Sequence, residues 1–173
     1  MNARGFSLVE ALVSVLILSI GLLGIAALHT KSLSGSHTAA TRTQSVLLAT
    51  DIAERMRANR IAVDTSAASN YDTIAAADNS CRAVHFGHSH AAVACTPAQL
   101  AADDLFDWQA QVAALLPAGV GRVCLDSTPD DGTSASAACD GVGTTYAVKI
   151  WWTEKARQNV AADEKRFATL VQP

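Results

Sequence analysis

Residues 5–28 read GFSLVEALVSVLILSIGLLGIAAL, and this stretch decides the fold. From Ala11 to Leu28 it holds 18 residues without a charge. At the rise of a helix this run spans roughly 27 Å, close to the hydrocarbon thickness of a bilayer. Arg4 carries the only basic side chain before it, and Glu10 lies at its start. Because a carboxylate there is costly in lipid unless a partner neutralises it, we expect a membrane helix with a further task.

Composition limits what the rest of the chain can be. The 173 residues suit one domain of ordinary size, and 50% hydrophobic residues exclude a disordered chain. A net charge of −3 argues against nucleic-acid contact through a basic surface. The sequence has no Gly-x-Ser-x-Gly, phosphate loop or dinucleotide fingerprint. We therefore predict neither enzyme activity nor a cofactor.

Two simple explanations of the apolar run are a secretory signal peptide and an uncleaved anchor. A signal peptide has a basic start, a shorter apolar core and a small-residue cleavage site. The segment from Gly5 to Glu10 instead resembles the class III signal peptide of type IV pilins and type II secretion pseudopilins. The resemblance rests on the glycine, the adjacent Phe6, the glutamate four residues later and the apolar run. It implies that a prepilin peptidase removes residues 1–5 by cutting after Gly5 and methylates the new amine of Phe6.

The same resemblance assigns a role to Glu10. In that family the glutamate is buried in the filament core, where it pairs with the terminal amine of an adjacent subunit. Gly21 and Gly24 lie in the middle of the helix, where glycine costs about 1 kcal/mol relative to alanine. They suit either local unwinding on assembly or close helix packing. Many pilins have a proline in this stretch and this chain has none, so a kink is not predicted.

Helical spacing of apolar residues resumes between Thr38 and Arg60 and predicts one long helix from Phe6 to about Asn59. Its first part, about residues 6–30, would be the membrane and filament-core half. Its second part would be the spine of a globular domain. The face expected to pack on that domain is Ala39, Thr43, Val46, Ala49, Ala53 and Met56.

Residues 47–60 read LLATDIAERMRANR. This segment resembles the signature of PilV-type minor pilins, also called type IV pilus modification proteins, and residues 20–24 also fit that family. Asp51–Arg55 and Glu54–Arg57 have the spacing of solvated ion pairs on a helix. The arginines are therefore interpreted as a charged helix face, and none is assigned as a binding residue.

Residues 61–173 are predicted to form the globular domain, with irregular structure over 61–93. A second helix is indicated by Thr96, Pro97 and Gln99, which have the pattern of a capping box with proline at the first helical position. Pro117 and Gly119 should end it. Its core face is expected at Ala101, Leu105, Trp108, Val112 and Leu115.

Three strands are expected, at residues 122–125, 146–152 and 167–171. Alternation in the second strand places Trp151 and Lys149 on one face. Trp151 is either a protein contact or a cover for the second helix, and the cover is favoured. The opposite face would hold Tyr146, Val148, Ile150 and Trp152. The expected architecture is α+β and pilin-like, with a long N-terminal helix, one extra helix and a small antiparallel sheet.

Four cysteines, Cys81, Cys95, Cys124 and Cys139, allow three pairings. A domain outside the inner membrane lies in an oxidising compartment, where disulfides persist. Pairing between sequence neighbours, Cys81–Cys95 and Cys124–Cys139, is the favoured arrangement. Because no Cys-x-x-Cys spacing occurs, zinc is not expected.

One cluster resembles a metal site, namely His85, His88 and His90. No carboxylate lies nearby and the segment lacks periodicity, so a polar surface loop is favoured over a metal site. Residues 128–132 resemble a turn more than a calcium loop, because the spaced acidic ligands and the terminal glutamate are missing. No metal is therefore predicted.

The resemblance implies a minor pilin that takes part in initiation, assembly or tip structure of a type IV pilus. It would be a single-pass inner-membrane precursor with a periplasmic domain before it joins the pilus, at or near the tip. Its expected partners are the prepilin peptidase, other minor pilins, the major pilin and a large tip adhesin. Such pili serve twitching motility, adhesion and DNA uptake. Alternatives are a minor pseudopilin of type II secretion and a periplasmic enzyme or sensor with an uncleaved anchor.

Overall fold

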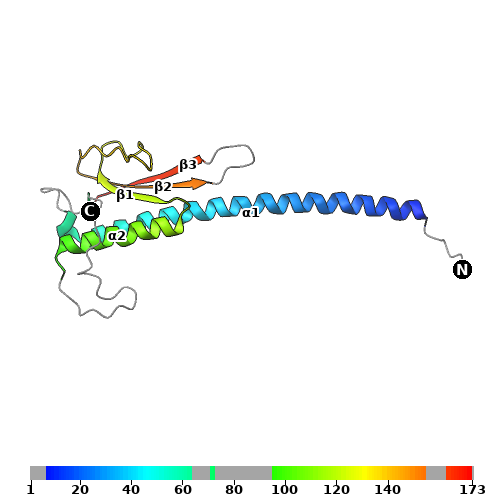
Figure 1. Cartoon of the computed structure of the whole chain (residues 1–173), viewed down its shortest axis with the longest axis horizontal. Helices are drawn as coiled ribbons and strands as arrows, with labels where there is room; N and C mark the ends of the chain where they lie inside the picture. Colours follow the sequence, from blue (N-terminus) through cyan, green and yellow to red (C-terminus); the bar gives the residue numbers. More distant parts are fainter. Residues whose placement is uncertain (1–6, 64–70, 73–94, 155–162, 173) are drawn as a thin grey trace. The chain divides into compact units, whose positions relative to one another are not determined.

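The computed structural model describes residues 7–63, 71–72, 95–154 and 163–172. The chain divides into two compact units, residues 1–40 and 41–173. Along the chain, two α-helices with a short 3₁₀ helix between them precede three strands, which confirms the expected α+β architecture (Figure 1). They are α1 (Leu8–Ala58), η1 (Arg60–Val63), α2 (Pro97–Leu115), β1 (Val120–Leu125), β2 (Tyr146–Glu154) and β3 (Asp163–Val171).

Helix α1 runs without a break for 51 residues, in agreement with the single long helix expected from the sequence. Gly21 and Gly24 adopt ordinary helical structure within it. Apart from the backbone of the helix itself, no atom of the described residues lies within 4 Å of the position that a Cβ would occupy at either glycine. Contacts among the described residues therefore do not require glycine there.

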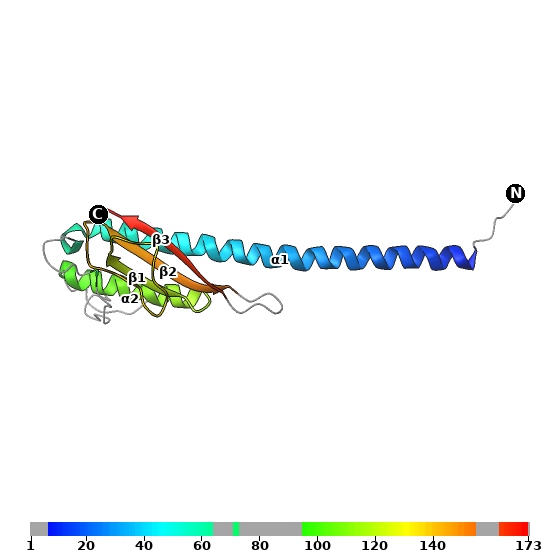
Figure 2. The same cartoon turned by 90° about the horizontal axis from the view of Figure 1, so that it is seen from above.

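The second unit is built on a three-stranded antiparallel sheet with the order β1-β2-β3. Val148 of β2 pairs with Val123 of β1 and with Thr169 of β3. Helix α2 and the part of α1 within this unit lie along the same face of the sheet (Figures 1 and 2). This face of the sheet and the two helices enclose the hydrophobic core, which includes Leu48, Ile52, Met56, Leu105, Trp108, Val112, Val123, Tyr146, Val148, Ile150, Trp152 and Val171.

Trp108 of α2 is central to this core. Its side chain is fully buried, and its indole Nε1 donates a 2.8 Å hydrogen bond to the carbonyl oxygen of Leu48 in α1. A Cβ at Gly121 of β1 would lie 2.6 Å from the Trp108 ring. Glycine at this position therefore lets β1 pass directly over the indole.

The capping box of α2 is confirmed, because Thr96 and Gln99 bond reciprocally at its start. The expected core face of α2 is right except at its end. Leu115 is 53% exposed, whereas Leu116 is only 2% exposed. The helix ends at Leu115, and the extended backbone of Leu116 directs the Leu116 side chain into the core.

In α1 the buried face is displaced from the expected one. Ala49, Ala53 and Met56 are buried as expected, but the other three members of that face are exposed: Ala39, Thr43 and Val46. The other buried positions of α1 are Ser45, Leu48 and Ile52. A helix with alanine and threonine on several sides offers more than one weakly apolar face, and the packing against α2 and the sheet selects one of them.

The expectation for Trp151 is wrong in both forms. It is only 1% exposed, so it is not an open protein contact. It also lies outside the core that contains Trp108, because β2 alternation directs it to the opposite face from Trp152. Both faces of β2 are therefore covered, and the second cover is the loop that follows β1.

Candidate functional site

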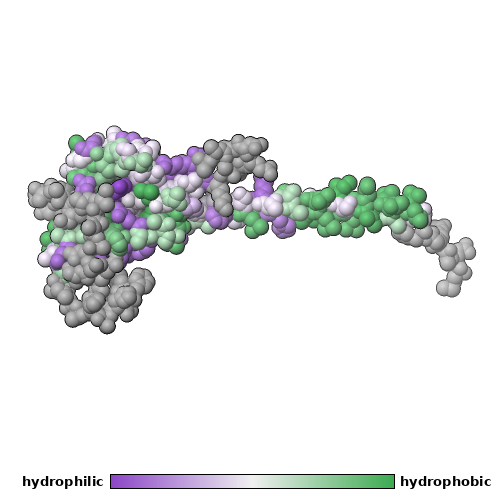
Figure 3. Space-filling model, in the orientation of Figure 1, coloured by the Kyte–Doolittle hydropathy of each residue, from purple (hydrophilic) through white to green (hydrophobic). Residues whose placement is uncertain are grey.

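The first unit presents an apolar helical surface. In Figure 3 the corresponding part of α1 is covered almost entirely by hydrophobic residues. By length and composition α1 is able to cross a membrane, and its most apolar window is not buried at all within the chain. The exposed large hydrophobic residues of this window include Leu12, Val13, Val15, Leu16, Ile17, Leu18, Ile20, Leu22, Leu23 and Ile25.

Glu10 lies in the first turn of α1 and is exposed. A carboxylate at this end of a helix is favoured by the helix dipole. The next side chain on α1 that can carry a positive charge is His29, about 28 Å further along the helix axis. Within α1, then, no cation can reach the Glu10 carboxylate. Gly5 and Phe6, the residues of the predicted cleavage and methylation site, lie outside the described residues.

Residues 47–60, at the end of α1, contact α2 within the second unit. The predicted ion pairs Asp51–Arg55 and Glu54–Arg57 are both present. Arg55 also reaches Asp104 of α2, with 3.2 Å between Nη1 and Oδ1. Burial alone lowers the pKa of Arg55, but the carboxylates of Asp51 and Asp104 outweigh it and raise the pKa. Arg55 is therefore a bridge between two helices as well as part of a charged face.

A network of hydrogen bonds continues this contact between the helices at Asn59. The Asn59 amide donates to the Pro97 carbonyl oxygen at 2.8 Å and to the Tyr71 hydroxyl at 3.3 Å. The Tyr71 hydroxyl donates in turn to Asp104 at 2.9 Å. Burial, followed by the charge of Asp104, raises the pKa of Tyr71 well above its usual range. No local pattern indicated a role for Tyr71 or Asp104, because this contact joins residues 33 positions apart.

A second polar cluster lies on the outer face of the sheet. Lys149 of β2 is fully buried, and its ammonium forms ion pairs with Asp126 and Asp131. The Nζ–Oδ1 distance to Asp131 is 2.9 Å, and the carbonyl oxygen of Ala137 accepts a third bond at 2.9 Å. All three partners belong to the loop between β1 and β2. This loop is folded around one internal cation.

The same loop is closed by a disulfide between Cys124 and Cys139, with a Cα–Cα distance of 6.1 Å. This is the local pairing that the sequence favoured. Cys95 is also disulfide-bonded, whereas Cys81 lies outside the described residues. The loop is thus held at its ends by a covalent bond and in its middle by Lys149.

Charges in this loop are coupled. Burial alone lowers the pKa of Lys149, but hydrogen bonds to Asp126 and Asp131 outweigh it and raise the pKa. The hydrogen bond from Lys149 lowers the pKa of Asp131. Both shifts favour the ionised pair, so the loop is held by charges over a wide pH range.

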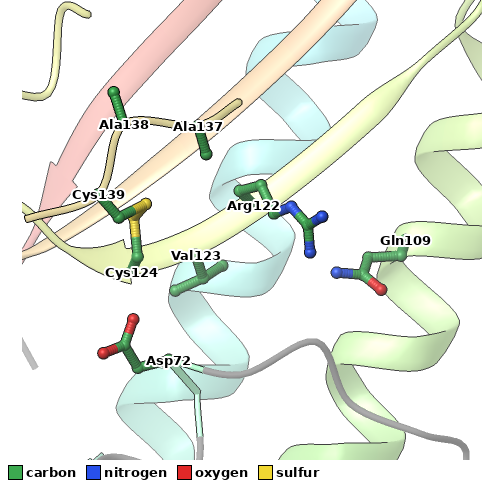
Figure 4. A pocket seen from close by; sticks show the side chains of 8 residues that line it. All are labelled: Asp72, Gln109, Arg122, Val123, Cys124, Ala137, Ala138 and Cys139. Atoms are coloured by element: carbon green, nitrogen blue, oxygen red, sulfur yellow. A yellow bond between two sulfur atoms is a disulfide. The ribbon is translucent and has the colours of Figure 1, made fainter. Parts of the chain in front are cut away.

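A pocket of about 270 Å³ opens beside this disulfide (Figure 4). In Figure 4 the Arg122 guanidinium extends toward Gln109 of α2, and Asp72 lies on the other side of Val123. Asp72 accepts the Leu125 backbone N–H, and burial raises its pKa. The remaining lining residues are Cys124, Ala137, Ala138 and Cys139. None of the lining residues is a histidine or a free thiol, so the pocket offers no nucleophile–base pair.

Metal binding has little support among the described residues. Cys124, Asp126 and Cys139 bring potential ligand atoms within 4.8 Å of one another, but both sulfurs are in the disulfide. Asp126 is already paired with Lys149. Residues 128–132 form a turn, with the Asp131 N–H bonded to the Thr128 carbonyl oxygen at 3.3 Å. His85, His88 and His90 lie outside the described residues.

Comparisons with known families agree with the apolar helix and the α+β domain. A family model described as type IV pilin Tt1218 matches residues 27–106. A second, described as the prokaryotic N-terminal methylation motif, matches residues 1–26. No curated protein and no solved structure matches the chain. The two matches imply processing by a prepilin peptidase and assembly with other pilins, and together they support a type IV pilin-like protein.

Proposed function

We propose that this chain is a minor pilin of the PilV type, which takes part in initiation, assembly or tip structure of a type IV pilus. The observation that carries this proposal is the segment of residues 47–60, which resembles the PilV-type signature. Its buried members Met56 and Asn59 and its bridging Arg55 tie α1 to α2. These contacts give the segment a structural task in the globular domain, which a simple membrane anchor would not need. The proposed task is structural, without catalysis or a cofactor.

The proposed life cycle follows from the first unit. The precursor is held in the inner membrane by α1, with its globular domain in the periplasm. A prepilin peptidase cuts between Gly5 and Phe6 and methylates the Phe6 amine. The exposed apolar surface of α1 then moves from lipid to the core of a filament, so the same residues satisfy both environments. Other minor pilins, the major pilin and a tip adhesin are the proposed neighbours.

Glu10 is proposed to pair with the terminal amine of an adjacent subunit. The support is physical, because a carboxylate moved into an apolar filament core is strongly unfavourable without a cation. The nearest cationic side chain of its own helix is about 28 Å away. An amine supplied by an adjacent subunit would meet this need. Pairing of this kind also sets how far two neighbouring helices slide along each other.

A minor pseudopilin of a type II secretion system is the second candidate, since it shares the leader and the apolar helix. One comparison separates the two. A deletion strain should lose surface pili and twitching but keep secretion through the type II pathway. Loss of secretion with normal pili would replace the proposal with the pseudopilin. If both processes are normal, the chain is an anchored protein of another kind.

Processing is tested on the mature chain by mass spectrometry. We expect an N-terminal methylated Phe6, and an intact Met1 in wild-type cells would contradict the proposal. For assembly, Glu10→Ala should be cleaved normally but recovered poorly in sheared pili. Ser14→Ala is a matched control, because Ser14 lies one turn away on the same exposed helix. Equal recovery of both variants would refute the pairing role of Glu10.

A further inference from the structure

A groove of about 190 Å³ runs between α1 and the last strand of the sheet in the second unit. Its α1 wall is formed by Val46, Ala49, Thr50, Ala53 and Arg57, and its other wall by Phe167, Thr169, Leu170 and Val171. Only one of these nine residues is charged, and Arg57 is paired with Glu54. Val46 and Leu170 remain 44% and 53% exposed. The groove is therefore an apolar surface that the described residues leave open.

The strand wall of this groove is a sheet edge. The Leu125 N–H donates to Asp72, and the Leu125 carbonyl oxygen accepts from Gly141, so neither group bonds to β2. In antiparallel strands the residues that bond to the neighbouring strand alternate, so this position identifies which residues of β1 and β2 bond to each other. The same alternation, carried through the register of β2 and β3, directs the backbone groups of Ala168 and Leu170 away from β2. No hydrogen-bond partner for them is found in the part of the chain that the structure describes. This edge can therefore accept another strand.

Charge divides β3 into two halves. Its first four residues, Asp163, Glu164, Lys165 and Arg166, are all charged. Charged side chains on an edge discourage pairing with another strand. Its last five residues, Phe167–Val171, carry no charge and are the part that lines the groove. Only the second half is suited to strand addition, and it suits an uncharged partner.

We propose that this groove, formed by α1 and residues 167–171, binds an extended, uncharged segment of another pilin-type subunit, which adds to β3 as a fourth strand. The occupant is taken to be a subunit because the matched pilin family and methylation motif imply assembly with other pilins, and because the other wall belongs to α1, which leaves Val46 exposed. Backbone hydrogen bonds at Ala168 and Leu170 would give affinity, and apolar contacts over the exposed side chains of Val46 and Leu170 would give specificity. The proposal rests on the chain being a filament subunit, but it holds equally for a pilus and a pseudopilus.

The direct test places a photo-crosslinking amino acid at Val46 in the full-length protein in cells. We expect a crosslink to another pilin-type subunit, mapped by mass spectrometry to an uncharged segment of extended structure. The same amino acid at Val142, which is 59% exposed and outside the groove, is the control. A crosslink from Val46 that maps to a helix, to a protein that is neither a pilin nor a pseudopilin, or to nothing would overturn the proposal.

Two variants test the edge itself. Ala168→Pro removes an N–H that points away from β2, so it leaves the ladder intact. Leu170→Lys adds a charge to the same edge. Ala168→Pro loses one hydrogen bond of about 1 kcal/mol, so it should lower the Val46 crosslink several-fold, up to about tenfold. Leu170→Lys should also lower it, because a charge at the edge opposes an uncharged strand. Leu115→Lys is a matched control, because Leu115 is also 53% exposed but lies on α2.

Each variant must keep its thermal stability and its Phe6 processing, which a folding defect would change. Unchanged crosslinking in both edge variants would refute strand addition. Crosslinks to pseudopilins in place of pilins would keep the groove assignment while overturning the proposed pilus function. A failure of strand addition at the groove can thus be distinguished from a failure of the proposed pilus function.

Discussion

Replacement of Lys149 by methionine should lower the free energy of unfolding by about 3 kcal/mol, although no apolar core contact is removed. Lys149 is fully buried, and its ammonium is the counter-charge of Asp126, whose side chain is also fully buried. Removal of one member of a buried ion pair typically costs about 3–5 kcal/mol, because the other charge is left unpaired. The lower end is expected here, since the other partner, Asp131, is 45% exposed and can be hydrated.

Thermal unfolding of the full chain in detergent, followed by tryptophan fluorescence, measures this effect. Trp151 lies two residues from Lys149 on the same face of β2, so it reports on this loop. For a domain of this size about 3 kcal/mol corresponds to a fall in Tm of roughly 10 °C. Lys165→Met is the control, because Lys165 pairs with the exposed Asp163 and should change stability by about 1 kcal/mol at most.

A double variant decides whether the cost comes from the unpaired carboxylate. Lys149→Met combined with Asp126→Leu removes both buried charges, and it should regain most of the lost stability. If Lys149→Met alone is as stable as the wild type, the ammonium does not hold the loop. If the double variant is no more stable than the single one, the loss is due to packing and the electrostatic explanation fails.

Three further outcomes are expected. Gly121→Ala should destabilise the domain by about 1–3 kcal/mol in urea unfolding, because its Cβ would meet the Trp108 ring at 2.6 Å. Cys139→Ser should cost about 3 kcal/mol in the same assay, since the disulfide spans 15 residues. Stability should also depend on pH at both extremes. The raised pKa of Lys149 gives stability that is complete below pH 10.5 and is lost as the pH rises through the raised pKa. The lowered pKa of Asp131 gives stability that is complete above pH 3.8 and is lost as the pH falls through the lowered pKa. A flat profile would contradict both shifts.

Local patterns predicted the helices and strands well. A capping box at Thr96 and proline at the next position act within one helical turn, so α2 could be located from a few residues. The single long helix followed from an apolar run and a resumed helical spacing. The ion pairs Asp51–Arg55 and Glu54–Arg57 also follow from spacing alone, because residues three or four apart on a helix are neighbours.

Positions that depend on where an element ends or what covers it were not predictable in this way. Leu116 is buried in place of Leu115, which was expected in the core, because α2 ends between them. Trp151 alternates as expected, yet it is buried by a loop on the second face of the sheet. Lys149 could not be recognised as buried, since a lysine is almost never found inside unless its charge is paired. Its partners lie 18 and 23 residues away along the chain.

Hydrophobicity and spacing within short windows of the sequence were enough to predict the apolar helix, the resemblance at its processing site and the α+β class. The sequence also predicted Glu10 as an assembly residue and Phe6 as the methylated residue, and both roles depend on other molecules. Tertiary structure alone decided that Arg55 and Asn59 join α1 to α2 and that Lys149 holds the loop between β1 and β2. It also decided that residues 167–171 form an open edge beside α1. Each of these depends on which distant segments of the chain pack together, because only that packing determines which groups are buried and which form hydrogen bonds.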